Sequence, residues 1–339
     1  MKSHQITIKD IARILEISPS TVSRALKDHP DISPETKKLV QSFAEKMKYR
    51  PNALALSLRS SKTFTIGVVI PEIVHHFFSS VISGIEDVAY AAGYKVMICQ
   101  SNENDAREAI NIQALLDSQV DGILISVSKT TRSAEQFARV IENNTPLVFF
   151  DRVCAEIESD RVIADDREGA RIATSHLIDC GCKKIMMLGS PLHMLIGKNR
   201  LEGYKDALMQ NNIAYNESLH LRCDTREDVE KHAGTIIKKA SEIDGIFAVN
   251  DSTAIAVMQL LIRHHYKIPQ QIKVIGFGDG PNATIASPTL STVEQKGYEI
   301  GKQATSLLLN RINDPENTEA FHTKVLTPEL KVRQSTSIQ

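Results

Sequence analysis

The first 50 residues alternate short apolar stripes with polar turns, in a pattern that predicts three helices. A capping-box sequence at 7–10 can begin a helix over 8–16, in which the apolar residues recur at helical spacing. Pro19 can start a second helix over 20–28, and a third runs from Ser33 to about residue 48. Two short helices joined by a tight turn inside a three-helix unit are typical of the helix-turn-helix.

From Phe64 onward, continuous apolar runs alternate with amphipathic segments. The runs predict the strands FTIGVVIP, YKVMICQS, DGILISVS, PLVFFD, KKIMMLGS, DGIFAVND and IKVIGFGD. The other segments predict helices near 76–92, 105–118, 133–143, 167–180, 197–211, 226–240, 252–265 and 296–312. Wholly apolar strands are typical of parallel sheets covered on both faces, so we expect a doubly wound α/β body.

The size of this body indicates two lobes, because its roughly 270 residues and many strands exceed what one sheet usually takes. The pattern lapses near 152–163 and 280–291, where we expect the lobes to separate. Ligands of doubly wound sheets bind beyond the carboxyl ends of the strands. We therefore expect a ligand site in the cleft between the two lobes.

The charge of the chain is unevenly distributed. Its net charge is −1, yet residues 1–62 hold 12 Lys and Arg against 6 Asp and Glu, and the remaining 277 residues hold 28 against 35. A basic head (net +6) on an acidic body (net −7) suggests a polyanionic partner for the head. Charge alone leaves open an exposed basic surface without a partner.

Several classes of protein are disfavoured by what the sequence lacks. It has no signal-peptide core and no apolar run of membrane-spanning length, so we expect a cytoplasmic protein. Its five cysteines show no paired metal spacing, so we expect free thiols, no metal and no cofactor. Gly-x-Ser-x-Gly, phosphate-loop and His-Glu-x-x-His motifs are absent, and the glycines of 276–280 are read as a strand-end loop; we expect no enzyme.

The second predicted helix would enter a DNA major groove with its N-terminus first. Its expected base contacts are Pro19, Ser20 and Arg24. Its expected phosphate contacts are Ser18, Thr21 and Ser23. Arginine is the best bidentate reader of guanine, which favours DNA recognition. A protein-binding helical bundle remains the alternative at this point.

The residues also resemble a known family. TVSR at 21–24, YRPN at 49–52 and LRS at 58–60 resemble the head of the lactose-repressor (LacI/GalR) family of transcription regulators. The body is similar to that family's periplasmic-binding-protein-like core through DGILIS, NRLEGY, AVNDSTAIAVM, IKVIGFGD, SPTLSTVEQ and KVRQST. The resemblance covers nearly the whole chain.

The resemblance implies a repressor that binds a near-palindromic operator as a homodimer or dimer of dimers, controlled by a small effector between the lobes. We expect a sugar or sugar derivative; a nucleobase or nucleoside effector, or a solute-binding protein without a regulatory role, is the alternative. A phosphorylated carrier protein is disfavoured, because Thr305 and Ser306 stand where an arginine should be. The implied parts are a helix-turn-helix domain (1–50), a hinge helix and linker (51–62), and a core (63–339) whose N-lobe spans 63–162 and 292–319 and whose C-lobe spans 163–290 and 320–334.

The resemblance also assigns residues to sites. The hinge helix, a marginal segment that inserts into the minor groove, is assigned Asn52, Ala55 and Leu58. The effector site is assigned Phe77, Phe78, Asp151, Arg200, Asn250, Asp279 and Gln295. One departure is evident: many members have an aspartate where this chain has Gly278, and Asp279 follows it. Either Asp279 takes that role from a shifted loop, or the effector is held differently.

Overall fold

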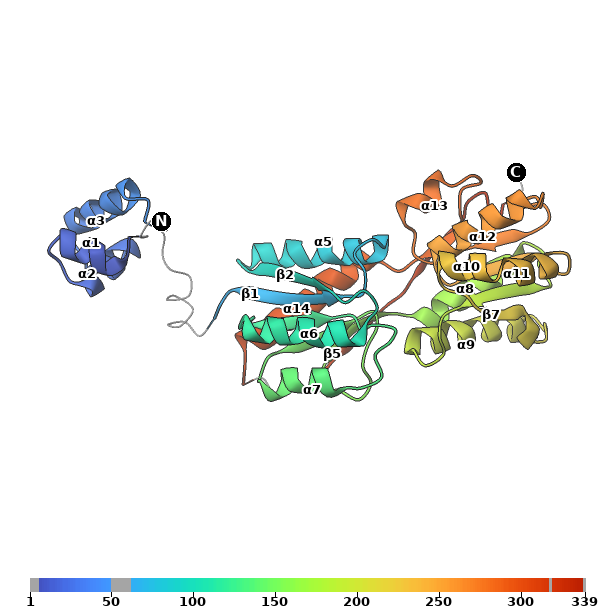
Figure 1. Ribbon diagram of the computed structural model, residues 1–339, viewed down its shortest axis with the longest axis horizontal. Helices are drawn as coiled ribbons and strands as arrows, with labels where there is room; N and C mark the ends of the chain where they lie inside the picture. Colours follow the sequence, from blue (N-terminus) through green and yellow to red (C-terminus); the bar gives the residue numbers. More distant parts are fainter. Residues whose placement is uncertain (1–5, 50–61, 317–318, 338–339) are drawn as a thin grey trace. The chain divides into compact units, whose positions relative to one another are not determined.

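The computed structural model describes residues 6–49, 62–316 and 319–337. The chain forms two compact units, a head that ends at Thr63 and a core that begins at Phe64 (Figure 1). The predicted hinge residues Asn52, Ala55 and Leu58 lie outside the described residues. Within the described ranges, no helix is long and apolar enough to cross a membrane.

The described residues of the head form three helices packed around a small apolar core that includes Val22 and Ala25. The helices are α1 (Ile8–Ile14), α2 (Pro19–Leu26) and α3 (Pro34–Lys46). Their N-caps are Thr7, Ser18 and Ser33, whose hydroxyls each accept a backbone N–H of the first turn. The predicted capping box is confirmed, because Asp10 Oδ2 accepts the Thr7 N–H at 3.1 Å and Thr7 Oγ1 accepts the Asp10 N–H at 3.2 Å.

The N-lobe of the core is built on a six-stranded parallel sheet with the order β11-β5-β4-β3-β1-β2. Its strands are β1 (Thr65–Ile70), β2 (Lys95–Gln100), β3 (Gly122–Ile125), β4 (Leu147–Phe150), β5 (Asp160–Ala164) and β11 (Thr323–Leu326). The helices that cover its two faces are α5 (His76–Ala91) with α14 (Gly297–Asn313), and α6 (Asp105–Asp117) with α7 (Glu135–Glu142). Helices α5 and α14 pack closely at Gly84, where a Cβ would collide with the Tyr298 carbonyl.

The C-lobe contains a four-stranded parallel sheet with the order β7-β6-β8-β9. Its strands are β6 (Ile185–Gly189), β7 (His220–Arg222), β8 (Gly245–Ala248) and β9 (Lys273–Ile275). The covering helices are α8 (Asp166–Asp179) with α9 (Leu195–Gln210) on one face, and α10 (Arg226–Lys231), α11 (Ala233–Ala240) and α12 (Asp251–Arg263) on the other. The lobe also contains the short helices η1 (Glu217–Leu219) and α13 (Pro281–Ile285). Both lobes are therefore doubly wound, as the apolar runs predicted.

Three segments connect the two lobes. They are the segment from β5 to α8, the segment from β10 (Thr292–Glu294) to α14, and the segment from β11 to β12 (Glu329–Lys331). Strands β10 and β12 pair antiparallel, and β10 is joined to the C-lobe by the bridge from Gly278 to Glu294. The chain thus passes three times between the two lobes of the core, so each lobe is built from segments that are distant in the sequence.

The strand pairing corrects two of the predicted boundaries. We assigned 320–334 to the C-lobe, but β11 pairs with β5 and belongs to the N-lobe sheet. We also began the second N-lobe segment at 292, but β10 lies with the C-lobe. Both strands are short, and β11 is a largely exposed edge, so their sequences carry no apolar pattern that shows which sheet they join.

Two further differences concern single elements. The predicted break near 152–163 contains β5, whose alternating burial differs from that of the wholly buried β3 and β4. The predicted helix over 226–240 is interrupted at His232 and forms α10 and α11. Neither difference changes the order of the main strands and helices.

Candidate functional site

Helix α2 presents its polar side to solvent, because Val22 and Ala25 on the opposite side are buried in the head. The three residues predicted to contact bases, Pro19, Ser20 and Arg24, are all exposed. The fold of the head therefore leaves these side chains exposed on a helix that can insert into the major groove of DNA.

Of the residues predicted to contact phosphates, Ser18 is the N-cap of α2, and Thr21 and Ser23 lie within the helix. The Ser18 hydroxyl accepts the Thr21 N–H at 3.0 Å and lies 2.7 Å from the Ser20 hydroxyl. Ser18 is exposed, and Thr21 and Ser23 are half-buried. Hydroxyls beside the N-terminus of a helix are suited to a phosphate, because the helix dipole and the free N–H groups favour an anion there.

We predict that Arg24→Ala reduces discrimination at one base pair of each operator half-site by about 1–3 kcal/mol. The measurement is a set of gel shifts against operators that differ at single positions. Arg13→Ala is the matched control, because Arg13 is an exposed arginine of α1 paired with Asp10. Equal weakening on every sequence would instead identify Arg24 as a phosphate contact.

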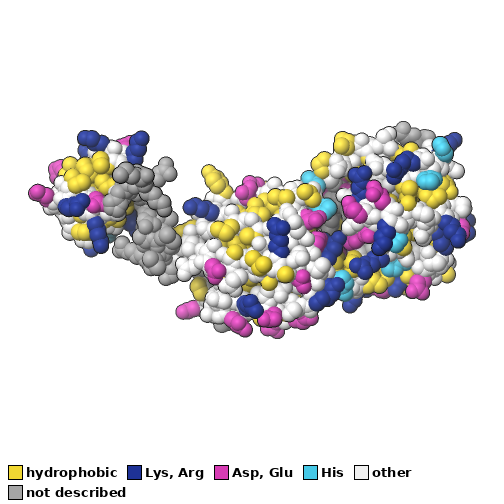
Figure 2. Space-filling view, viewed as in Figure 1, with side chains coloured by type: hydrophobic (Ala, Val, Ile, Leu, Met, Phe, Trp, Pro, Cys, Tyr) yellow, Lys and Arg dark blue, Asp and Glu magenta, His cyan; other side chains and the backbone are white. Residues whose placement is uncertain are grey.

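In the core, residues that follow the strands of one lobe meet residues that follow the strands of the other. Asp151 follows β4 in the N-lobe, and its charge interacts with Asp166 and Arg200 of the C-lobe. Figure 2 shows charged side chains of both signs along this junction. This cluster of charged residues therefore lies where the carboxyl ends of the two sheets face each other, which is the end of a parallel sheet at which ligands bind in doubly wound folds.

Arg200, on α9, is almost fully buried and held on three sides. Its Nε and Nη2 donate to Asp166 Oδ1 at 2.8 and 2.7 Å, and its Nη1 donates to the Val249 carbonyl at 2.6 Å. Its Cζ lies 4.1 Å from the centre of the Phe277 ring. A guanidinium has five N–H groups, so two remain for a ligand while the charge is already balanced by Asp166.

Asp151 is the acidic counterpart of Arg200, and it is 7% exposed. Its closest polar partners are Ser126 Oγ at 3.4 Å and Arg152 Nε at 3.7 Å, so both carboxylate oxygens lack a short hydrogen bond from the described residues. Burial raises the pKa of Asp151 to about 6, against the opposing effects of Arg152 and Arg200. The Asp151 carboxylate can thus accept hydrogen bonds from a ligand.

Arg152 belongs to this site, although the sequence reasoning did not include it. Its Nη1 donates to both oxygens of Glu103, at 2.7 and 3.0 Å, and its guanidinium lies 5.7 Å from the centre of the Phe78 ring. Its Nε is buried without a hydrogen-bond partner among the described residues. An Asp-Arg pair directly after a buried strand was a signal that could have identified it.

The other predicted residues contribute in different ways. Asn250 caps α12 by accepting the Thr253 N–H at 2.8 Å, and its amide also donates to the Asp224 carbonyl at 2.7 Å. Phe78 is buried in the N-lobe core, whereas Phe77 beside it is half-buried. Gln295 is buried at the connection between β10 and α14. Asn250 and Phe78 therefore have structural roles that constrain what they can offer a ligand.

Asp279 is already engaged within the C-lobe. Its Oδ1 accepts a hydrogen bond from Arg333 Nη2 at 2.6 Å. Gly278 has φ +141°, a backbone conformation that residues other than glycine rarely adopt. An aspartate at 278 would be strained in this loop, which gives a physical reason for the departure from the family pattern.

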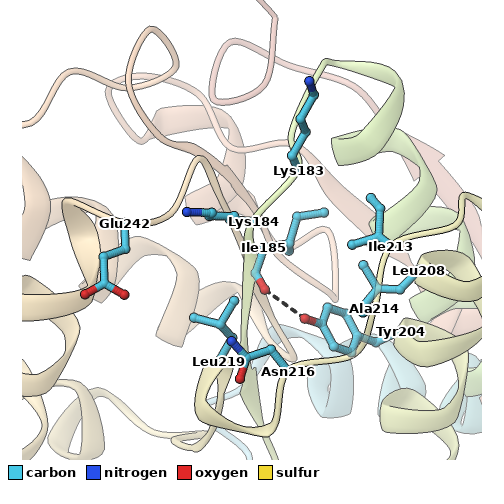
Figure 3. A pocket seen from close by; sticks show the side chains of 10 residues that line it. All are labelled: Lys183, Lys184, Ile185, Tyr204, Leu208, Ile213, Ala214, Asn216, Leu219 and Glu242. Atoms are coloured by element: carbon cyan, nitrogen blue, oxygen red, sulfur yellow. Dashed lines mark hydrogen bonds between the residues drawn. The ribbon is translucent and has the colours of Figure 1, made fainter.

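Two pockets lie at the amino ends of strands, away from Asp151 and Arg200. One of about 180 Å³ adjoins the start of β6, where Tyr204 Oη donates to the Ile185 carbonyl at 2.7 Å (Figure 3). The other, of about 380 Å³, adjoins Asp160 and Arg311. Ligands of parallel sheets bind at the opposite ends of the strands. In the described ranges, no group of three or more His, Cys, Asp and Glu is arranged to hold a metal ion.

Comparisons with known proteins identify both parts of the chain. Residues 7–52 match the family model for bacterial regulatory proteins of the lacI family, and residues 174–336 match a periplasmic binding protein-like domain. The ribose operon repressor of Haemophilus influenzae is 31% identical over 332 residues, which cover 97% of this chain and 98% of that protein. The chain belongs to the LacI family.

This LacI-family chain is a DNA-binding transcriptional repressor with a helix-turn-helix head and a two-lobed core. It is also similar to the HTH-type transcriptional repressor PurR of Vibrio campbellii, at 31% identity over 335 residues that cover 97% of this chain and 98% of that one. The structure of the lac repressor dimer bound to operator and the anti-inducer ONPF has the same fold, with a TM-score of 0.85, 21% identity and coverage of 98% and 99%.

We predict that Asp151→Asn stabilises the effector-free repressor in a pH-dependent manner. The pKa of the Asp151 carboxyl is about 6 in the folded chain and near 3.8 for an ordinary aspartate. Between these pH values the folded chain binds more protons than the unfolded chain, so the free energy of unfolding falls as pH rises. Replacing the carboxylate should increase that free energy by up to about 3 kcal/mol at pH 8 and by about half as much at pH 5.

The measurement is denaturant unfolding of both proteins at the two pH values. Asp206→Asn is the control of opposite sign, because the Arg167 guanidinium beside Asp206 lowers the pKa of that carboxyl. A gain for Asp151→Asn that is the same at pH 5 and pH 8 would show that the carboxylate of Asp151 is not destabilised by burial.

Proposed function

We propose that operator binding by the head is controlled by a small effector that bridges Asp151 of the N-lobe and Arg200 of the C-lobe. A ligand that contacts both lobes has different affinities for different lobe arrangements, and this difference is what couples the two sites. We place this activity in the cytoplasm, with operator DNA as the partner of the head and with a regulatory role in place of a catalytic one.

The charges at the junction favour an uncharged, hydroxyl-rich effector. The carboxylates there are Glu103, Asp151, Asp166 and Asp224, and the cations are Lys129, Arg132, Arg152 and Arg200. Lys129, Arg152 and Arg200 each already have a carboxylate partner, and Asp151 is the acid without a short bond. Hydroxyl groups can donate to Asp151 and accept from the two remaining N–H groups of Arg200, whereas an anionic ligand would have no hydrogen to donate to Asp151 and would be repelled by its carboxylate.

A sugar or sugar derivative satisfies these requirements, and the name of one relative, a ribose operon repressor, agrees with it. A nucleobase or nucleoside is the second candidate, which the relative named PurR supports. A solute-binding protein without a regulatory role is disfavoured, because the head carries a complete helix-turn-helix. We give Phe77, Asn250 and Gln295 supporting contacts in this site; Asp279 contributes only if its ion pair with Arg333 opens.

We predict that Arg200→Ala abolishes the effector response and leaves operator binding intact. Thermal-shift screening of pentoses, hexoses and nucleosides supplies the ligand, and gel shifts with and without it measure the response. Since removing Arg200 leaves Asp166 buried and unpaired, Arg200→Ala with Asp166→Asn is the second variant. Arg167→Ala, which breaks an exposed pair with Asp206, is the matched control. A response that survives in both Arg200 variants would contradict this assignment.

We also propose that two copies associate through the edge of the N-lobe sheet to bind a near-palindromic operator. Strand β2 is an edge strand that exposes Met97 and Ile98 on its two faces. The flanking helices α5 and α6 expose Tyr90 (85%) and Ile110 (68%). Hydrophobic side chains gather on the N-lobe surface in Figure 2. An exposed apolar edge strand promotes association unless it is covered.

We predict that Tyr90→Lys with Ile98→Lys converts a dimer into monomers and weakens operator binding, because a monomer contacts one half-site. Sedimentation velocity measures the assembly state of the full chain. Met209→Lys, at an exposed apolar position of α9, is the control. An unchanged dimer would mean that the copies associate through another surface.

A further inference from the structure

The loop 128–132, between β3 and α7, makes direct contacts from the N-lobe to the C-lobe. Lys129 Nζ lies 3.2 Å from Asp224 Oδ2. His193 Nε2 donates to the Lys129 carbonyl at 2.9 Å, which leaves Nδ1 as the acceptor for Arg132 Nη2 at 3.5 Å. Lys129 thus contacts two separate segments of the C-lobe, one through its side chain and one through its backbone carbonyl.

The N-lobe holds this loop in place before any contact is made. Glu103 Oε2 accepts the Lys129 N–H at 2.7 Å. Glu108, which is fully buried, accepts the Ser128 N–H and the Thr131 hydroxyl, both at 2.7 Å. Two carboxylates of the neighbouring segment therefore fix the backbone of the loop, so little conformational freedom is lost when it meets the C-lobe.

The two C-lobe partners are attached to the elements that carry the effector residues. Asp224 follows β7, and its carbonyl accepts the Asn250 amide. His193 lies between β6 and α9, the helix on which Arg200 is found. Moving the lobes apart would break both contacts and separate Asp151 from Arg200 in the same motion.

We propose that Lys129, Asp224 and His193 form an interlobe latch that holds the lobes closed over the effector site when no effector is bound. The inference rests on the proposed function, since the latch acts on the lobe arrangement to which the effector responds. The effector has to enter through an opening that breaks the latch. The strength of the latch sets the population of the closed, effector-free repressor, and hence its basal operator affinity.

A zero-length carbodiimide tests the closed state in the full chain without any effector. The reagent joins a lysine amine to a carboxylate only when the two are in contact, and mass spectrometry identifies the linked peptides. We expect an amide between Lys129 and Asp224. Lys331 with Glu294, at 3.1 Å within the β10–β12 pair, is the matched control. Formation of the control link alone would overturn the latch.

Measuring operator affinity distinguishes a latch, which affects DNA binding, from a contact that only stabilises the fold. Lys129→Met and Asp224→Asn should each shift the operator Kd of the effector-free repressor in the same direction, by about two- to fivefold for a partly exposed pair. The double variant should shift it no further than the larger single change. Lys331→Met and Glu294→Gln should leave it unchanged.

The outcomes distinguish the latch from the proposed function. An unchanged operator Kd in both latch variants, with the cross-link present, would overturn the latch while leaving effector control in place. If the wild-type chain fails to bind any operator, the proposed function fails, and the cross-link still reports whether the lobes close.

Discussion

The buried charge of Arg200 is the constraint on which the arrangement of the core depends. A guanidinium out of contact with water has to be matched by an acid and by hydrogen-bond acceptors. Asp166 at the start of α8 and the Val249 carbonyl at the end of β8 supply them, and Phe277 covers one face. These partners come from three separate elements of the C-lobe. The ion pair therefore fixes the orientation of α9 and the direction in which Arg200 faces the N-lobe.

Asp151 is a second constraint on the core, and its buried carboxylate destabilises the fold. Its burial raises its pKa, so at neutral pH the folded chain carries an ionised group in an environment that disfavours it. The nearby cations are paired elsewhere, with Glu103 and Asp166. A buried acid that lowers stability and has no short hydrogen bond within the protein is typical of a binding site, because a bound ligand can donate the missing hydrogen bonds. The proposed preference for a donor-rich effector rests on the same imbalance.

Much of the fold could be predicted from the sequence, because its signals are local. The cap at Thr7, the turn before Pro19 and the buried runs of the central strands each act within a few residues. The pairing of β11 and β10 could not be predicted, because short, partly exposed strands are placed by tertiary contacts. The family resemblance named Asp151 and Arg200, but not their relation to each other.

Other features of the site were not visible in the sequence for physical reasons. Arg152, Lys129 and Asp224 are charged residues of kinds that most often lie on solvated surfaces. Arg152 is paired with Glu103, 49 positions away within the N-lobe, and only the meeting of the two lobes pairs Lys129 with Asp224. The ion pair of Asp279 with Arg333 joins residues that are 54 positions apart. Long-range contacts of this type leave no periodic pattern in a sequence.

In the proposed function, one ligand site that spans Asp151 and Arg200 is thermodynamically coupled to operator binding. Calorimetric titration of the sugar with the largest thermal shift, into the free repressor and into the repressor–operator complex, tests it most directly. Linkage requires the ratio of the two ligand affinities to equal the ratio of operator affinities with and without ligand. We expect two unequal ligand affinities whose ratio obeys this equality. Identical ligand affinities in the free and operator-bound protein would contradict it.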